Sequence, residues 1–106
     1  MKRGEIWSLR DRGYVSKPRP VVVVQSDAHD VFDSVILCLF TTYDSRDVPT
    51  RVFVEATPDN GLNENSYVMT EKMMTVTKTN LGERIGRLTA ENMDEISTQL
   101  RRVLDL

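Results

Sequence analysis

Two apolar runs in the first half of the sequence constrain the fold more than any other feature of this chain. The first, roughly residues 19–26, contains four consecutive valines, Val21 to Val24, and the second runs from Ser34 to Thr41. Valine is branched at Cβ and fits a pleated strand, and an unbroken apolar run indicates a strand that is buried on both faces. About seven polar residues separate the runs, and such a short connection favours an antiparallel pair.

The register of this strand pair brings two polar residues together. If the turn centres near Asp30, residue i lies opposite residue 60 − i, which places Arg19 opposite Thr41. An arginine can bind a phosphate with two N–H groups, and a hydroxyl can donate a hydrogen bond or relay a proton. We therefore expect a site at one end of a rigid sheet, flanked by the loops 10–18 and 42–49. The alternative is an ordinary solvated surface pair.

The rest of the chain contains weaker strand signals and one helix. We expect further strands at 4–9, 50–56, 66–70, 74–77 and 84–88, a turn at 58–61 and a single turn at 78–83. After Thr89, a plausible N-cap, the apolar residues follow a helical spacing: Met93, Ile96, Leu100, Val103 and Leu104. The pattern predicts one domain, residues 1–106, that is mainly β: a curled antiparallel sheet closed by a C-terminal amphipathic helix.

Composition narrows the functional classes. The chain has 106 residues, 40% of them apolar, which suits a single core. Its net charge of −2 does not by itself indicate a nucleic-acid-binding protein, but Arg10, Arg12, Lys17 and Arg19 form a local basic cluster. No run approaches the roughly 18 apolar residues of a membrane-spanning helix, and the amino terminus is charged. We therefore expect a cytoplasmic protein that does not contact a membrane.

The residues that usually bind metals are sparse. Cys38 is the only cysteine and lies within an apolar run, so it is expected to be a small buried hydrophobe. His29 is the only histidine, and its acidic neighbours do not complete a ligand set, so a surface loop position is expected. We predict neither a metal site nor another cofactor.

Several motifs resemble the MazF/PemK toxins. They are Arg3-Gly4-Glu5-Ile6-Trp7, the segment from Lys17-Pro18-Arg19-Pro20 to Gln25, and the segment 35–42 that ends in two threonines. Weaker similarity covers 62–77, 81–86 and the final helix. The resemblance implies an SH3-like β-barrel of about six strands with a C-terminal helix, the MazF/Kid/CcdB-like toxin fold. It also implies a homodimer whose interface groove holds single-stranded RNA.

The resemblance also implies an activity. It is metal-independent endoribonuclease cleavage within a type II toxin–antitoxin system, leaving 2′,3′-cyclic phosphate and 5′-hydroxyl ends and inhibiting translation and growth. A cognate MazE-like antitoxin would fill the RNA groove, and DNA would be bound only indirectly, through the antitoxin complex. The catalytic residues would be Arg19 and Thr41, with Arg19 stabilising the transition state, since arginine is a poor general base with a pKa above about 12.

Five further residues are candidate RNA contacts. These are Lys17, Tyr14, Thr42, Tyr43 and Ser66. Lys17 has a simpler interpretation as a solvated lysine, and Tyr14 as a tyrosine packed on its own domain. Tyr43 is equally explained as part of a solvated loop, and Ser66 as the first residue of a strand. Thr42 would take the place of Thr41 if the register slips by one residue.

Two departures from the family pattern affect the expected RNA specificity. The loop 10–17 is shorter than in many relatives, and Lys72 stands where many relatives have glutamine. The alternative function, for the same fold, is a non-catalytic toxin that binds a protein such as DNA gyrase. A domain that has lost activity and only regulates transcription with a partner is a third reading. The Arg19/Thr41 pair favours the ribonuclease over both.

Overall fold

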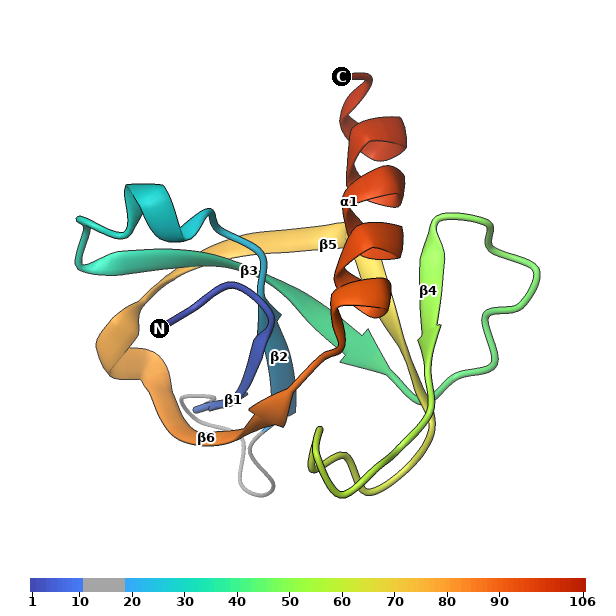
Figure 1. Ribbon diagram of the computed structural model, residues 1–106, viewed down its shortest axis with the longest axis horizontal. Helices are drawn as coiled ribbons and strands as arrows, with labels where there is room; N and C mark the ends of the chain where they lie inside the picture. Colours follow the sequence, from blue (N-terminus) through green and yellow to red (C-terminus); the bar gives the residue numbers. More distant parts are fainter. Residues whose placement is uncertain (11–18) are drawn as a thin grey trace.

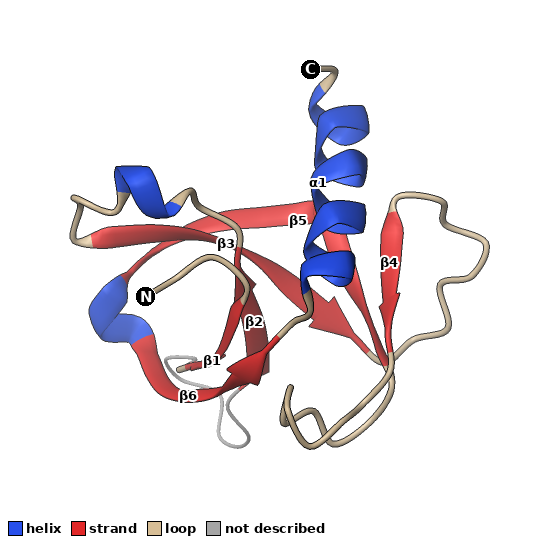
Figure 2. Ribbon diagram, in the orientation of Figure 1, coloured by secondary structure: helices blue, strands red, loops and turns tan. Residues whose placement is uncertain are grey.

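The computed structural model describes residues 1–10 and 19–106, which form a strongly curled sheet and one long helix (Figures 1 and 2). The strands are β1 (Glu5–Leu9), β2 (Arg19–Val23), β3 (Ser34–Thr41), β4 (Arg51–Val54), β5 (Ser66–Thr77) and β6 (Leu81–Arg87). The helices are the short 3-10 turns η1 (Asp27–His29) and η2 (Lys78–Asn80) and the C-terminal α1 (Ala90–Leu104). No helix in the described part of the chain is long and apolar enough to cross a membrane.

The six strands form one antiparallel sheet in the order β4-β5-β3-β2-β1-β6. The expected mainly β fold with a C-terminal helix is therefore confirmed. The sheet curls without closing, because β4 and β6 are its two edge strands. In Figure 1 the long strands β3 and β5 run across the molecule, and the C-terminal end of α1 projects beyond them.

The register of the central pair is the expected one. Val21 lies opposite Leu39, Val22 opposite Cys38 and Val23 opposite Leu37, so each pair of numbers sums to 60. Continuing this register by two residues brings Arg19, at the start of β2, opposite Thr41, at the end of β3.

Alternate residues of these strands enter two separate cores. On the face covered by α1, Val22, Cys38 and Val68 pack with Ile96 of the helix. On the other face, Val21, Val23 and Leu37 pack inside the curl with Leu81. Burying a valine side chain contributes roughly 1.5–3 kcal/mol, so the buried four-valine run stabilises both cores. Cys38 is fully buried, as expected, and burial raises its pKa to about 12.

The expected division of β5 into two short strands is wrong. One step along β3, from Cys38 to Leu39, corresponds to four steps along β5, from Met73 to Met69. The intervening Thr70, Glu71 and Lys72 form a bulge that interrupts the alternation without ending the strand. The bulge bends β5, so that its first half pairs with β4 and its second half follows the curl.

The C-terminal helix begins as expected and ends more exposed than expected. Thr89 is its N-cap, with the hydroxyl accepting a hydrogen bond from the Asn92 N–H at 3.0 Å. Ile96 is fully buried, and Met93 and Leu100 pack against the same core. Val103 and Leu104 were expected on this apolar face, but they lie in the projecting final turn and are exposed.

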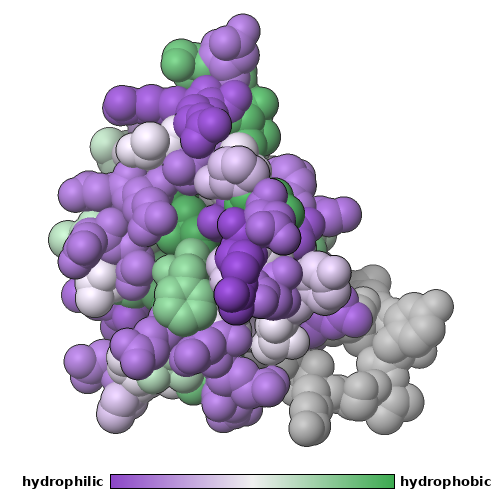
Figure 3. Space-filling view, turned by 90° about the vertical axis from the view of Figure 1, so that its right-hand side faces the viewer, coloured by the Kyte–Doolittle hydropathy of each residue, from purple (hydrophilic) through white to green (hydrophobic). Residues whose placement is uncertain are grey.

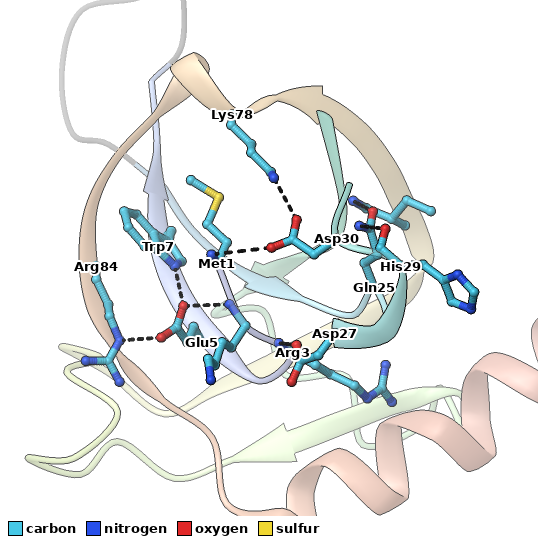
Figure 4. Close-up of polar contacts among 12 residues, drawn as sticks. Met1, Arg3, Glu5, Trp7, Gln25, Asp27, His29, Asp30, Lys78 and Arg84 are labelled. Atoms are coloured by element: carbon cyan, nitrogen blue, oxygen red, sulfur yellow. Dashed lines mark hydrogen bonds and ion pairs between the residues drawn. The ribbon is translucent and has the colours of Figure 1, made fainter. Parts of the chain in front are cut away.

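Polar contacts tie the amino-terminal segment to the strands around it (Figure 4). Glu5 accepts a hydrogen bond from the Trp7 indole and pairs with Arg84 at 3.1 Å. At the opposite end of β3 from Thr41, Lys78 pairs with Asp30 at 2.6 Å. His29 is exposed on η1, which confirms its assignment to the surface.

Candidate nucleic-acid interface

The site predicted from the sequence lies at one end of the β2–β3 pair. Arg19 is exposed, and Thr41 is half-buried. Both belong to the face that carries Val21 and Leu39, because side chains on a strand alternate with a period of two. The two side chains therefore project from the same side of neighbouring strands, and the axes of neighbouring strands lie about 4.8 Å apart.

The Thr41 hydroxyl is held in place by its own loop. Its Oγ1 accepts a hydrogen bond from the backbone N–H of Tyr43 at 3.1 Å. This contact occupies the oxygen as an acceptor and leaves the O–H available as a donor. Thr41 can therefore donate to a phosphate oxygen without losing its orientation.

Further hydrogen bonds anchor this loop to the bulge of β5. The Ser45 hydroxyl donates to the Tyr43 carbonyl at 2.9 Å, and Arg51 Nη1 donates to Ser45 Oγ at 3.0 Å. Arg51 also pairs with Glu71 at 2.6 Å. The Arg51 hydrogen bond lowers the pKa of Glu71, which keeps its carboxylate ionised. A continuous chain of contacts thus connects the bulge with the residue that follows Thr42.

A second group of polar residues lies beside Thr41. The register pairs Thr41 with Tyr67, whose hydroxyl donates to Asp44 Oδ1 at 3.2 Å. Arg46 pairs with Asp44 at 2.8 Å, and this hydrogen bond lowers the Asp44 pKa. Partial removal from water and the Asp44 carboxylate raise the pKa of Tyr67, so its phenol remains a donor at neutral pH.

The structure brings together some of the other predicted RNA contacts and separates one. Thr42 and Tyr43 are exposed directly after Thr41, and Tyr43 has 74% of its surface accessible. Ser66 is buried, and its hydroxyl donates to the Glu64 carbonyl. It faces the same core as its partner Val54, opposite to the Thr41 face, which favours its simpler interpretation as the first residue of a strand. Lys17 and Tyr14 lie outside the described residues.

Sequence reasoning missed the supporting residues of this site. Asp44, Arg51, Tyr67 and Glu71 come from one loop and two strands, and no local motif links them. Lys72 is exposed in the β5 bulge, next to Glu71. Within residues 1–10 and 19–106, no three or more His, Cys, Asp or Glu side chains are grouped as metal ligands.

Comparison with known proteins places this geometry in a family. Residues 2–104 match the family described as PemK-like, MazF-like toxin of type II toxin–antitoxin systems. The chain belongs to the PemK/MazF toxin family. The family resemblance inferred from the amino-terminal motifs is therefore confirmed.

The similarity extends over almost the whole toxin domain. A probable endoribonuclease MazF of Mycolicibacterium smegmatis is 40% identical over 94 residues, covering 88% of this chain and 86% of the relative. Endoribonuclease MazF6 of Mycobacterium tuberculosis is 37% identical, covering 86% and 82%.

Among solved structures, a mycobacterial endoribonuclease in complex with its cognate antitoxin superposes with a TM-score of 0.81 and 29% identity. That match covers 100% of this toxin chain and 96% of the other. A MazE–MazF structure from Deinococcus radiodurans has a TM-score of 0.83 at 18% identity, covering 100% and 96%, and shares the fold.

Proposed function

We propose that this toxin is a sequence-specific endoribonuclease that cuts single-stranded RNA without a metal ion. The observation that carries the proposal is the placement of Arg19 and Thr41 on one face at the end of the β2–β3 pair. The names of its relatives, which are endoribonucleases, support the same activity. Cleavage of cellular RNA would inhibit translation and growth.

The proposed reaction uses a nucleophile that the substrate provides. The ribose 2′-hydroxyl oxygen attacks the adjacent phosphorus, a P–O2′ bond forms, and the P–O5′ bond breaks. The products are a 2′,3′-cyclic phosphate and a 5′-hydroxyl, so the 2′-hydroxyl loses a proton and the leaving oxygen gains one. The protein must therefore align the groups and stabilise the charge that develops on the phosphate.

Two residues suit these tasks. The Arg19 guanidinium offers planar N–H donors to two phosphate oxygens and stabilises the transition state. Thr41 donates its hydroxyl hydrogen to a third oxygen of the reacting group, while the Tyr43 N–H fixes its orientation. Thr42 and Tyr43 extend the contact along the RNA. Lys17 and Tyr14, close to Arg19 in sequence, are proposed to hold the adjacent backbone and a base.

The proposed partners follow from the same surface. A cognate MazE-like antitoxin would cover the RNA site. A structural relative is described as an endoribonuclease in complex with its cognate antitoxin, which supports such a partner. Two copies of the chain would form the RNA groove between them. DNA would be bound only through the antitoxin.

Incubation of the purified protein with a long RNA in excess EDTA tests the proposal, with cut sites mapped by primer extension. We expect a short recurring sequence at the cuts, and product ends that carry a cyclic phosphate and a 5′-hydroxyl. Thr41→Val should abolish cutting, whereas Thr41→Ser should retain part of it. Cleavage that stops with EDTA and returns with magnesium would contradict the proposed chemistry. Growth arrest without any RNA cleavage would favour the gyrase-type alternative.

A further inference from the structure

We infer that Arg51 is a positioning residue of the ribonuclease site, and that it holds the loop 42–50 in the shape that orients the Thr41 hydroxyl. The inference rests on the proposed ribonuclease function, because this hydroxyl has a reaction to serve only if the protein cuts RNA. It adds to the site a side chain of β4 that acts through Ser45 and the Tyr43 backbone, without touching the phosphate that is cut.

Arg51 is separated from Thr41 by a whole strand. Arg51 of β4 lies opposite Met69 of β5, and Thr41 of β3 lies opposite Tyr67 of β5. Neighbouring strands are about 4.8 Å apart, so the backbones of Arg51 and Thr41 are separated by about 10 Å. The guanidinium is bonded to Ser45 in the loop, so its influence on Thr41 passes through that loop.

The loop depends on polar contacts for its shape. Residues 42–50, all of which the structure describes, contain no helix or strand, and only Ser45 among them is buried, at 1% exposure. Figure 3 shows the side of the molecule that carries β4, and this side is mostly hydrophilic around a small apolar area. Few buried apolar contacts leave a segment free to open locally. Hydrogen bonds to Ser45 are therefore expected to order the loop.

Ser45 connects the Arg51 guanidinium with the backbone beside Thr41. A serine hydroxyl has one hydrogen to donate, and Ser45 donates it to the Tyr43 carbonyl at 2.9 Å. The same oxygen accepts a hydrogen bond from Arg51 Nη1 at 3.0 Å, which directs the hydroxyl hydrogen away from Arg51. The Tyr43 N–H donates in turn to Thr41 Oγ1 at 3.1 Å. Both polar groups of the Tyr43 backbone are thus held, one by Ser45 and the other by Thr41.

The guanidinium is itself fixed by the bulge of β5. Its Nε and Nη2 donate to Glu71 Oε2 at 3.1 and 2.6 Å, while Nη1 points to Ser45. The Arg51 side chain is only 19% exposed, so these contacts are partly shielded from water, which strengthens them. Thr70, also in the bulge, donates its hydroxyl to the Thr50 carbonyl at 2.6 Å. The bulge therefore holds the end of the loop at two points.

The same contacts favour positioning over direct binding of RNA by Arg51. All three nitrogens of its guanidinium donate to Glu71 or Ser45, and the Glu71 carboxylate beside them would repel a phosphate. Arg19, by contrast, is exposed. The rate of a phosphate transfer depends steeply on the placement of the groups that serve it. Loss of Arg51 should therefore slow the chemical step and leave RNA binding almost unchanged.

Cleavage kinetics on an RNA that contains a mapped cut site test the inference. Arg51→Met should lower kcat by about 10-fold to 100-fold with little change in KM, because misplacing a catalytic group costs up to about 10²-fold in rate. Ser45→Ala removes the connecting hydroxyl and should have a similar effect. The double variant should be no slower than the slower single variant, because both changes break one chain of contacts. Arg51→Lys keeps the charge but not the planar donors, and should recover only part of kcat.

Exchange of the Tyr43 amide hydrogen with water, measured by NMR, reports the same contacts without RNA. It should be several-fold faster in Arg51→Met and in Ser45→Ala than in the wild type, because the bond to Thr41 opens more often. The Asn92 amide, which donates to the Thr89 hydroxyl at the start of α1, is the internal reference and should not change. Arg101→Met removes an exposed arginine of α1, and should leave both kcat and Tyr43 exchange as in the wild type.

The outcomes separate the positioning role from the proposed function. A wild type that cuts no RNA overturns both. If the wild type cuts RNA and Arg51→Met has a normal kcat, only the positioning role falls. A raised KM at normal kcat, with a salt dependence of RNA binding reduced by about one phosphate contact, would make Arg51 an RNA ligand instead.

Two further results would also overturn the positioning role. Full recovery of kcat by Arg51→Lys would show that a positive charge is sufficient without the planar contacts. An equal rise in the exchange of the Tyr43 and Asn92 amides would show that the substitution loosens the whole fold rather than the loop.

Discussion

At the scale of single residues, the proposed reaction needs only a few chemical groups from the protein. The substrate brings the nucleophile, so one guanidinium and one hydroxyl can supply charge stabilisation and orientation. Arg19 is exposed at the first position of β2, where its side chain makes little contribution to either core. Substitution of Arg19 should therefore change activity without changing stability.

We predict that Arg19→Ala abolishes most RNA cleavage and leaves the fold intact. Loss of a preorganised donor to a transition-state charge costs about 10²–10³-fold in rate. A surface substitution usually changes stability by less than about 0.5 kcal/mol. Arg19→Lys should recover little activity, because an ammonium group cannot bind two phosphate oxygens in one plane.

Cleavage rates and melting curves on the same samples check this prediction. Arg101→Ala, an exposed arginine on the last turns of α1, is the charge-matched control and should cut RNA normally. A folded Arg19→Ala protein that cuts at nearly the wild-type rate would remove Arg19 from the site.

The sequence predicts only part of the site, for a physical reason. Arg19 and Thr41 belong to strands that are joined by a short turn, so the turn alone sets their register. Tyr67 lies beside Thr41 through the pairing of β5 with β3, which is not its neighbour along the chain, and Phe53 of β4 lies beside Tyr67. Local alternation shows which face a residue takes, but not which residue of another strand lies beside it.

At the scale of elements, the bulge in β5 is the feature that sequence patterns do not reveal. The alternation ends at Thr70 and resumes at Met73 in another register, so one bent strand resembles two short ones. The same bulge places Glu71 opposite the guanidinium of Arg51. A departure from the regular pattern thus becomes an anchor for the loop that follows Thr41.

We predict that Arg51→Met makes stability less sensitive to acid. Arg51 lowers the pKa of Glu71 in the folded state, so their contact stabilises the fold above the unfolded pKa of about 4.3. That contribution is lost as the pH falls through the lower folded pKa. In Arg51→Met the Glu71 pKa returns towards its usual value, and this part of the acid dependence disappears.

Thermal melting between about pH 3 and pH 7 measures the effect. The difference in melting temperature between wild type and Arg51→Met should be largest at neutral pH and should shrink towards pH 3. Arg101→Met removes the same charge from the exposed end of α1, and should follow the wild-type profile. A constant difference across the range would show that Arg51 stabilises the loop without the Glu71 charge.

The C-terminal helix allows a second prediction at this scale. Thr89→Ala removes the side chain that accepts the Asn92 N–H, and losing such an N-cap costs about 1 kcal/mol. For a domain of this size the melting temperature should fall by about 4 °C. Thr98→Ala is the internal control, because its hydroxyl only bonds back to the Asp94 carbonyl within the helix. If both variants melt alike, the cap does not limit the stability of the helix.

At the scale of the whole molecule, fold class was predictable because its signals are redundant. The strand pair at the centre, the turn at 58–61 and the change to a helical period after Thr89 all indicate the same mainly β architecture. The overall charge of −2 was the least informative quantity, since the candidate RNA site uses only a local set of donors.

We predict that the toxin is a homodimer in solution. The side chains expected to form its interface include Met73 and Met74, each 39% exposed on β5, whereas Trp7 and Met69 are half-buried. A stable interface usually buries about 1,600 Å² in total and has an apolar centre. Exposed methionines suit such a centre because their flexible side chains adapt to an opposing surface.

Light scattering at tens of micromolar should give the mass of two chains for the wild type, about twice 12.1 kDa. The double variant Met73→Glu/Met74→Glu should shift towards one chain, because two carboxylates would have to lose their water in the interface. Val31→Glu/Phe32→Glu adds the same charge at two more exposed apolar residues, before β3, and should remain dimeric. A wild-type mass of one chain would contradict the dimer. A dimer that survives the methionine substitutions would place the interface on another face, and the exposed end of α1, with Val103 and Leu104, would be the next to test.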